Sequence, residues 1–273
     1  MGTEIKALLL AAGVGSRLRP LTDVLPKCLM PINGRPLLEY WLTMLCAAGV
    51  EQVVVNLHHH AGLVRDYVER SPFAPNVVFS YEKELLGTGG TLLNNRKALE
   101  GAPVMLAHAD NLSVFDVSKF VERHARRPAP ACMTMMTFVA ANPENCGIVE
   151  LDQSGLLRAF HEKVGNPPGK RANAAVYMVE PSIFSFLESL GKPVIDFSTE
   201  VIPAHLGKIF TYHNDIYHRD IGTLASLMQA QFDYPLVSKS SPDEAWRRLL
   251  AKDDFRLARE FRHCIEQAYG GQL

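Results

Sequence analysis

The chain is 273 residues long and 47% of these residues are hydrophobic, so it can bury the core of one large α/β domain. Its 28 Lys and Arg nearly balance its 29 Asp and Glu, which gives no electrostatic basis for nucleic acid as a partner. The five cysteines lack C-x-x-C spacing, so we expect neither a disulfide framework nor a zinc site. We see no signal peptide and no apolar run of membrane-spanning length, so we expect a cytoplasmic protein without a membrane partner.

Strand and helix patterns alternate along the first part of the chain. Short apolar runs predict strands over 5–11, 53–57 and 77–81, and apolar residues at helical spacing predict helices over 36–48 and 61–70. The first helix has Pro36 in its expected first turn and Gly49 just after its last apolar residue. This order of elements is typical of a parallel sheet covered by helices.

The later part of the chain adds more strands than helices. Strands are expected over 104–107, 131–138, 147–151 and 174–179, with a helix over 181–190. We therefore predict an α/β fold with a mixed, mainly parallel sheet flanked by helices. A main domain over 1–235 is followed by a charged helical extension over 236–273, which is either a small subdomain or an interface element of a homo-oligomer.

The stretch LLLAAGVGSRLRP, residues 8–20, carries the first strand into a glycine-rich loop. Gly13 and Gly15 lack side chains that would keep a ligand away from the backbone, so the N–H groups of residues 13–16 can point at an anion. Arg17 and Arg19 add positive charge next to them. The loop is therefore a candidate phosphate-binding site.

Two better-known phosphate-binding loops fit this stretch less well. The dinucleotide pattern G-x-G-x-x-G needs a third glycine where this chain has Leu18, and the next strand ends in Asn56 rather than an acidic residue. An NAD-dependent dehydrogenase is thereby disfavoured, and a Walker loop fails because no G-K-[ST] follows the glycines. The run His58 to His60 has no cysteine or carboxylate at ligand spacing and predicts strand-end contacts rather than zinc.

A longer pattern begins at the same loop. LAAGVGSRLRPLT is followed by PKCLMPINGRP and then, in order, by ELLGTGGTL, AHADN, FHEKV, NAAVY and RDIGT. This series closely resembles the signature of the sugar-1-phosphate nucleotidylyltransferases, such as those for mannose 1-phosphate with GTP or glucose 1-phosphate with dTTP. The resemblance implies a Rossmann-like nucleotidyltransferase fold over 1–235. It also implies an enzyme that joins a nucleoside triphosphate to a sugar 1-phosphate and releases pyrophosphate, with Mg²⁺ as cofactor.

The resemblance implies roles for individual residues. Arg17 and Lys27 are expected to be catalytic because they neutralise phosphate charge, and Asp110 and Asp220 to hold Mg²⁺. Taken alone, Asp110 fits a turn and Asp220 fits a helix N-cap equally well. Nucleotide binding is expected at two glycine loops and their surroundings, namely Leu10, Ala11, Ala12, Gly13, Gly15, Ser16, Glu82, Gly87 and Thr88.

The sugar phosphate is expected to bind farther along the chain. Lys163 would pair with the phosphate, while Glu162 and Asn173 would hydrogen-bond the sugar. For the base, Glu82 or Glu84 could accept hydrogen bonds from the N1 and N2 groups of guanine. This favours GTP with a mannose-like hexose 1-phosphate over dTTP or UTP with glucose 1-phosphate. A noncatalytic regulatory protein that binds nucleotide sugars is the alternative function.

Overall fold

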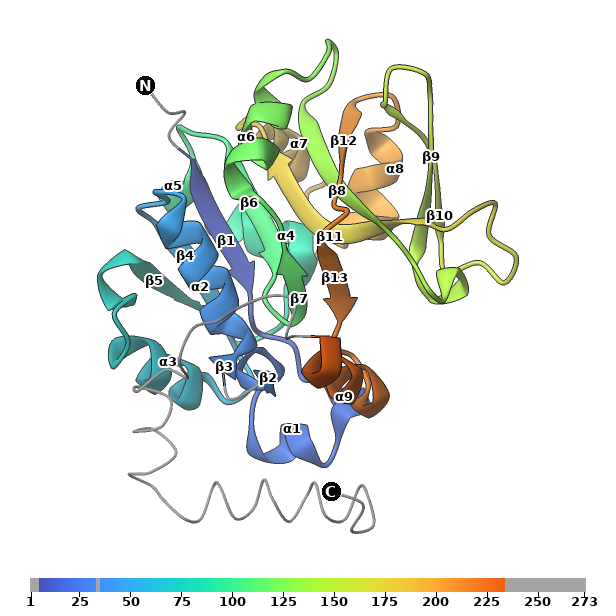
Figure 1. Ribbon diagram of the computed structural model, residues 1–273. Helices are drawn as coiled ribbons and strands as arrows, with labels where there is room; N and C mark the ends of the chain where they lie inside the picture. The colour runs from blue at the N-terminus through green and yellow to red at the C-terminus, as the bar shows by residue number, and fades with distance from the viewer. Residues whose placement is uncertain (1–4, 33–34, 234–273) are drawn as a thin grey trace.

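A nine-stranded sheet forms the centre of the molecule (Figure 1), seen in a computed structural model that describes residues 5–32 and 35–233. Four neighbouring strands are parallel: β5 (Val77–Tyr81), β4 (Val53–Leu57), β1 (Lys6–Leu10) and β6 (Val104–His108). The antiparallel strand β11 (Arg171–Val179) pairs with β6 and joins this half to the rest. The rest comprises β8 (Met133–Val139), β9 (Gly147–Leu151), β10 (Leu157–Glu162) and β12 (Ile209–His213).

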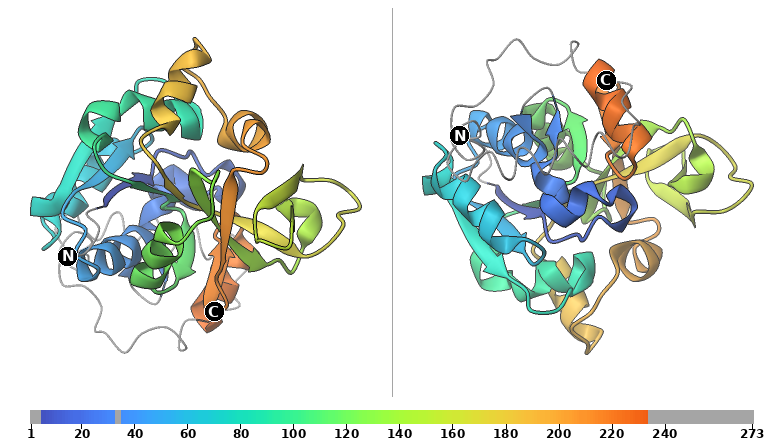
Figure 2. Two further views of the ribbon diagram at one scale, coloured as in Figure 1. Left: turned by 90° about the horizontal axis from the view of Figure 1, so that it is seen from above. Right: turned by 90° about the horizontal axis from the view of Figure 1, so that it is seen from below.

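Helices cover both faces of this sheet, as the views along its edge show (Figure 2). Successive residues of β1 point to opposite faces. Ala7 and Leu9 belong to the core shared with α2 (Leu37–Ala47), α3 (Ala61–Glu69) and α6 (Val117–Ala125). Leu8 belongs to the core shared with α4 (Gly87–Asn94), α5 (Arg96–Leu99) and α7 (Ile183–Ser189). The predicted mixed, mainly parallel α/β fold is confirmed.

A two-stranded ribbon lies outside the main sheet. It consists of β7 (Asn111–Val114) and β13 (Tyr217–Asp220), which run antiparallel with Asp220 opposite Asn111. The helix α9 (Leu224–Asp233) follows β13 directly. The ribbon therefore brings the end of the described chain back to the strand that follows β6.

Short elements complete the described chain. Near its start lie η1 (Ser16–Leu18), α1 (Leu21–Val24), η2 (Lys27–Leu29) and the small hairpin of β2 (Pro31–Ile32) and β3 (Arg35–Pro36). Later come η3 (Ala74–Asn76), η4 (Pro143–Asn145), the π-helical turn η5 (Phe197–Val201) and α8 (Ile202–Ala204). Among these residues and the longer elements, none forms a helix long and apolar enough to span a membrane.

Predicted and observed elements agree closely in the parallel half of the sheet. The strands at 53–57 and 77–81 have the expected bounds, and Gly49 follows α2 in the left-handed conformation with φ 80°. Pro36 lies one residue before the first helical residue rather than inside the first turn. The GTGG segment, expected as a loop, begins the helix α4. The expected extension over 236–273 lies outside the described residues.

Candidate active site

Two adjoining pockets lie at the carboxyl ends of the parallel strands, where open α/β sheets bind their ligands. Each has a volume of about 180 Å³, and Asp110 lines both. The first, called pocket A here, is lined by Leu10, Ala12, Gly13, Asn56, Glu82, Leu85, Gly87, Thr88, Thr91, His108 and Asp110. The second, pocket B, is lined by Gly15, Ser16, Arg17, Lys27, Asp110 and Gly222.

The first glycine loop is held in shape by its neighbour α1. Gly15 has φ 66°, and a Cβ atom on it would lie 2.8 Å from Thr22 Cγ2, so both conformation and space require glycine. Thr22 Oγ1 donates a 2.9 Å hydrogen bond to the carbonyl of Gly15. The ring of His59 contacts the Thr22 carbonyl at 3.0 Å through Nε2. His59 therefore contacts α1, the helix that supports the glycine loop.

The ribbon of β7 and β13 brings together two carboxylates that are far apart in the sequence. Asp110 lies in the turn between β6 and β7, and Asp220 is the last residue of β13, opposite Asn111. Trp41 of α2 anchors this turn because its Nε1 donates a 2.9 Å bond to the Asn111 carbonyl. The N-cap interpretation of Asp220 is wrong, since β13 ends there and α9 begins only at Leu224.

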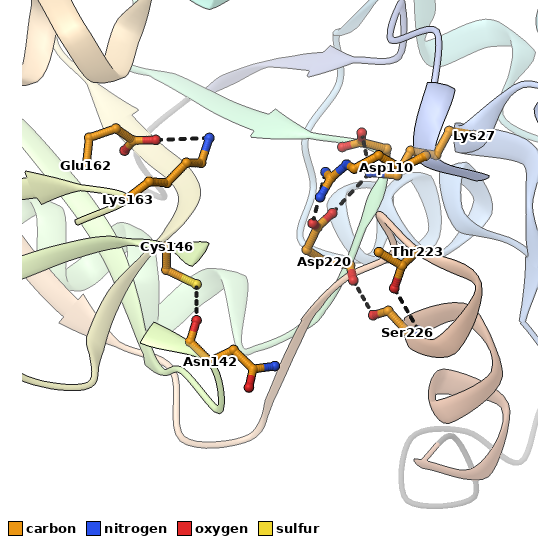
Figure 3. Close-up of polar contacts among 10 residues, drawn as sticks. Lys27, Asp110, Asn142, Cys146, Glu162, Lys163, Asp220, Thr223 and Ser226 are labelled. Atoms are coloured by element: carbon orange, nitrogen blue, oxygen red, sulfur yellow. Dashed lines mark hydrogen bonds and ion pairs between the residues drawn. The ribbon is translucent and has the colours of Figure 1, made fainter. Parts of the chain in front are cut away.

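Lys27 connects the two carboxylates (Figure 3). Its Nζ lies 2.7 Å from Asp110 Oδ2 and 3.0 Å from Asp220 Oδ1. Burial alone would lower the pKa of Lys27, but the two carboxylate charges outweigh it and the pKa is raised. Burial alone would raise the pKa of Asp110, yet the charge of Lys27 leaves that pKa lowered. Lys27 and Asp110 are therefore both charged at neutral pH.

Arg17 completes this cluster from the glycine-loop side. Its Nη2 lies 3.6 Å from Asp220 Oδ2, and its side chain is largely exposed. A Cβ atom on Gly222 would lie 2.6 Å from Asp220 Oδ2 and 2.7 Å from Arg17 Nη2. The glycine of the RDIGT motif thus leaves room for the Arg17–Asp220 pair.

The carboxylates of this cluster suit a hard divalent cation. Magnesium is commonly held by one or two protein carboxylates, with water and substrate phosphates as its other ligands. Asp110 and Asp220 both contact a single positive group, the Lys27 ammonium, so their oxygens converge on one cation position. Within residues 5–32 and 35–233, no three or more His, Cys, Asp or Glu side chains are grouped so that they could hold a metal ion. A metal at this cluster would therefore need water or substrate oxygens as its other ligands.

Pocket A contains a buried carboxylate, that of Glu82. Its Oε1 accepts bonds from Asn56 Nδ2 at 3.1 Å and Thr91 Oγ1 at 2.6 Å. From the residues that the structure describes, its Oε2 accepts only a long 3.4 Å bond from the Leu86 N–H. Since a carboxylate has about four acceptor sites, Oε2 retains capacity for a ligand. Glu84, the other candidate for base recognition, is exposed and does not line this pocket.

The second glycine loop packs tightly against residues 193–195. The N–H of Gly89 and the N–H of Gly90 donate to the Ile195 carbonyl at 2.9 and 3.4 Å. A Cβ atom on Gly90 would lie 2.1 Å from the Pro193 carbonyl oxygen, and one on Gly87 would lie 2.6 Å from that of Ile195. These glycines therefore fix one wall of pocket A by close packing.

Of the predicted sugar-phosphate residues, Glu162 ends β10, Lys163 follows it directly outside the strand, and Asn173 lies in β11. Lys163 Nζ is 3.2 Å from Glu162 Oε1. Figure 3 shows this pair on the opposite side of the view from Lys27, Asp110 and Asp220. Lys163 has φ 49°, and its N–H donates to the Cys146 carbonyl at 3.2 Å. The side chain of Asn173 accepts from the Ala175 N–H at 2.9 Å and donates to Tyr177 at 2.6 Å. Its polar groups thus hold the irregular middle of β11.

The structure gathers most of the predicted nucleotide and metal residues around the two pockets. Ala11 and Asp220 line neither pocket: the Ala11 N–H donates a 2.7 Å bond to Asn56 Oδ1, and Asp220 reaches pocket B only through its ion pairs with Lys27 and Arg17. Sequence reasoning missed Asn56, Thr91 and His108 as lining residues. Asn56 and His108 end parallel strands, a position that could have indicated them.

The family model for nucleotidyl transferases matches residues 6–235, which include both pockets. The chain belongs to the nucleotidyl transferase family. It is 30% identical over 249 residues to a mannose-1-phosphate guanylyltransferase of Mycobacterium tuberculosis, covering 89% of this chain and 68% of the relative. It is 29% identical over 250 residues to the mannose-1-phosphate guanylyltransferase catalytic subunit beta of Drosophila pseudoobscura pseudoobscura, covering 89% and 66%. This nucleotidyl transferase thus spans about two thirds of the length of these relatives.

Solved structures share the fold of this nucleotidyl transferase. A protein from Bacillus anthracis assigned as a glucose-1-phosphate thymidylyltransferase has a TM-score of 0.77 at 18% identity, covering 89% of this chain and 99% of that one. HddC from Yersinia pseudotuberculosis, solved with GMP-PN, has a TM-score of 0.71 at 22% identity, covering 84% and 99%. The prediction of an enzyme from the sugar-1-phosphate nucleotidylyltransferase family is confirmed.

Proposed function

We propose that this protein transfers GMP from GTP to a mannose-like hexose 1-phosphate and releases pyrophosphate. The observation that carries the choice of base is the free acceptor capacity of Glu82 Oε2 in pocket A. Guanine presents neighbouring N1 and N2 donors, which match a carboxylate. Uracil and thymine present one N–H between two carbonyl oxygens, which a carboxylate repels. The mannose-1-phosphate guanylyltransferase relatives support the same choice.

The proposed chemistry requires positioning and charge neutralisation rather than a protein nucleophile. The sugar phosphate oxygen attacks the α-phosphorus while charge spreads over the leaving pyrophosphate. The glycine loop and Arg17, which line pocket B, would bind the triphosphate, and Lys27 would neutralise its charge where the two phosphates meet. Lys163 would hold the sugar phosphate, with Glu162 at the sugar hydroxyls. Mg²⁺ held by Asp110 and Asp220 would supply charge neutralisation at the triphosphate.

The decisive experiment is a matrix of nucleoside triphosphates against hexose 1-phosphates, with pyrophosphate release as the readout. We expect the highest kcat/KM for GTP with mannose 1-phosphate or a related hexose 1-phosphate. Faster turnover of dTTP or UTP with glucose 1-phosphate would contradict the proposed base. Saturable binding of nucleotide sugars without pyrophosphate release for any pair would instead support the regulatory protein. A cytoplasmic location and the oligomeric state stay predictions to be tested separately.

A further inference from the structure

The ammonium group of Lys27 occupies the position on which both carboxylates converge. Its contacts of 2.7 Å to Asp110 and 3.0 Å to Asp220 are made by a side chain that is only 7% exposed. A buried charge is costly without its partners, so this ammonium leaves them only if other anions replace them. A positive group of the protein itself therefore offsets part of the negative charge of the two carboxylates.

Arg17 does not compete for this position. Within residues 5–32 and 35–233 its one ion pair is with Asp220, at 3.6 Å, and its side chain is 69% exposed. Arg17 can therefore turn toward solvent or a phosphate at little cost. The cluster as a whole contains two positive and two negative groups, so its charges balance before any substrate binds.

A divalent cation on the same carboxylates would compete with the Lys27 ammonium. Magnesium binds oxygen at about 2.0–2.1 Å, and an ammonium hydrogen-bonded to the same oxygens would lie within a few ångströms of it. The two positive charges repel strongly at that range. Pocket B, which Lys27 and Arg17 both line, lies beside the cluster. Phosphate groups bound there would give the displaced ammonium a new partner.

We infer that Lys27 is an internal counter-ion, which keeps free divalent metal off Asp110 and Asp220 and exchanges places with metal when nucleotide phosphates enter pocket B. The inference rests on the proposed magnesium site and adds a positioning role for Lys27. It predicts opposite effects of one substitution: loss of Lys27 impairs phosphate transfer, yet strengthens metal binding to the nucleotide-free protein.

The test measures Mn²⁺ binding to the nucleotide-free protein by electron paramagnetic resonance. If Lys27 holds the site nine-tenths of the time or more, Lys27→Met and Lys27→Gln should bind Mn²⁺ about tenfold more tightly than the wild type. Lys27→Arg keeps the positive charge and should bind as weakly as the wild type. Lys119→Met, which removes an exposed lysine from α6, controls for the change in net charge and should leave Mn²⁺ affinity unchanged.

Asp110→Asn separates failure of this inference from failure of the proposed metal site. If Asp110→Asn leaves Mn²⁺ affinity unchanged, the proposed site itself is wrong. If Asp110→Asn weakens binding while Lys27→Met and Lys27→Gln do not tighten it, only the counter-ion role is overturned. A second measurement avoids substitutions altogether: saturating Mn²⁺ should raise the labelling rate of Lys27 in the wild type by an amine-reactive reagent, relative to Lys119. An unchanged relative rate would also overturn the inference.

Discussion

Lys163 lies apart from the Lys27 cluster, so the two proposed substrates can be tested independently (Figure 3). Its side chain is 67% exposed and, among the residues that the structure describes, forms an ion pair with Glu162 alone. Lys163→Met should therefore raise the KM for sugar 1-phosphate far more than the KM for nucleotide, because one ammonium–phosphate contact is lost. Steady-state kinetics with each substrate varied in turn measure this. Lys170→Met, an exposed residue farther along the same connection, is the control, and equal changes in both KM values would refute the assignment.

The two carboxylates of the cluster should act as one unit. Asp110→Asn or Asp220→Asn should lower kcat by about a hundredfold or more, the scale of losing one strong electrostatic contact to the transition state. The double variant should lose much less than the product of the single effects, since both residues would bind one ion. Pyrophosphate release across a Mg²⁺ titration measures these effects, with circular dichroism to verify folding.

A matched substitution controls for the loss of a surface charge in that test. Asp215 is exposed in the connection before β13, so Asp215→Asn should turn over at the wild-type rate. Near-normal turnover of either folded single variant at limiting Mg²⁺ would remove that aspartate from the site. The regulatory protein would then again be a serious alternative.

The role of a single residue could be predicted where the motif requires one type of side chain. It was harder to predict where the role depends on which way the side chain lies in the folded protein. The arginine, lysine and two aspartates of the cluster were predicted and lie together. Glu82 and Glu84 were equivalent in the sequence, and only the fold separates them: Glu82 is buried by Asn56 and Thr91, whereas Glu84 points outside pocket A. Side-chain direction at a strand end depends on contacts that are distant in the chain.

At the scale of elements, the helix α4 depends on glycines that allow close packing. Gly90→Ala would place a Cβ atom 2.1 Å from the Pro193 carbonyl oxygen, a backbone atom that cannot easily move. We expect a loss of about 1–3 kcal/mol in the free energy of unfolding, the usual cost of overpacking. Because Gly87 and Thr88 of α4 line pocket A, the KM for nucleotide should also rise. Urea denaturation and steady-state kinetics measure the two effects.

Gly62 provides the matched control for that substitution. It also lies in a helix, α3, but a Cβ atom on it would meet nothing within 4 Å. Gly62→Ala should therefore stabilise the protein by about 0.5–1 kcal/mol through helix propensity alone. If Gly90→Ala and Gly62→Ala had the same effect on stability, packing against residues 193–195 would not be the reason for the glycine.

Elements with a strong local signal were predicted, and those defined by partners were not. The parallel strands are apolar on both faces because helices cover both, so their runs are visible in the sequence. The strands β7 and β13 are four residues each and pair across more than a hundred residues of chain. Nothing local marks them, although they bring Asp110 and Asp220 together.

At the scale of the whole molecule, the order of strands and helices predicted the fold class, whereas the family was indicated by the motif series alone. The near-even balance of charges gave no electrostatic basis for expecting nucleic acid as a partner, and the alternation of strands and helices predicted the layered sheet that the structure has. Asn173, one of the residues proposed to bind the sugar, lies where the register of β11 against β8 becomes irregular, between Asn173 and Tyr177. Such a register is a property of the assembled sheet.

The stability of the whole molecule should depend on pH through a buried histidine that lines neither pocket. His124 is 3% exposed, with Nδ1 2.8 Å from Thr134 Oγ1 and Nε2 2.9 Å from Glu180 Oε1. Arg127 Nη2 lies 2.6 Å from the same Glu180 oxygen and already neutralises it. Burial, together with the charge of Arg127, lowers the pKa of His124 to about 4.

The sign of the pH effect follows from this lowered pKa. An unfolded histidine has a pKa of about 6.5, so between pH 6.5 and 4 the unfolded chain binds more protons than the folded one. The folded state is therefore fully favoured above pH 6.5, and its free energy of unfolding should fall by about 3 kcal/mol at most as pH drops to 4. Urea denaturation between pH 7.5 and 4 measures this, and His124→Gln should show a shallower fall than the wild type. Parallel pH profiles for the two proteins would show that His124 is protonated as readily in the folded state as in the unfolded chain.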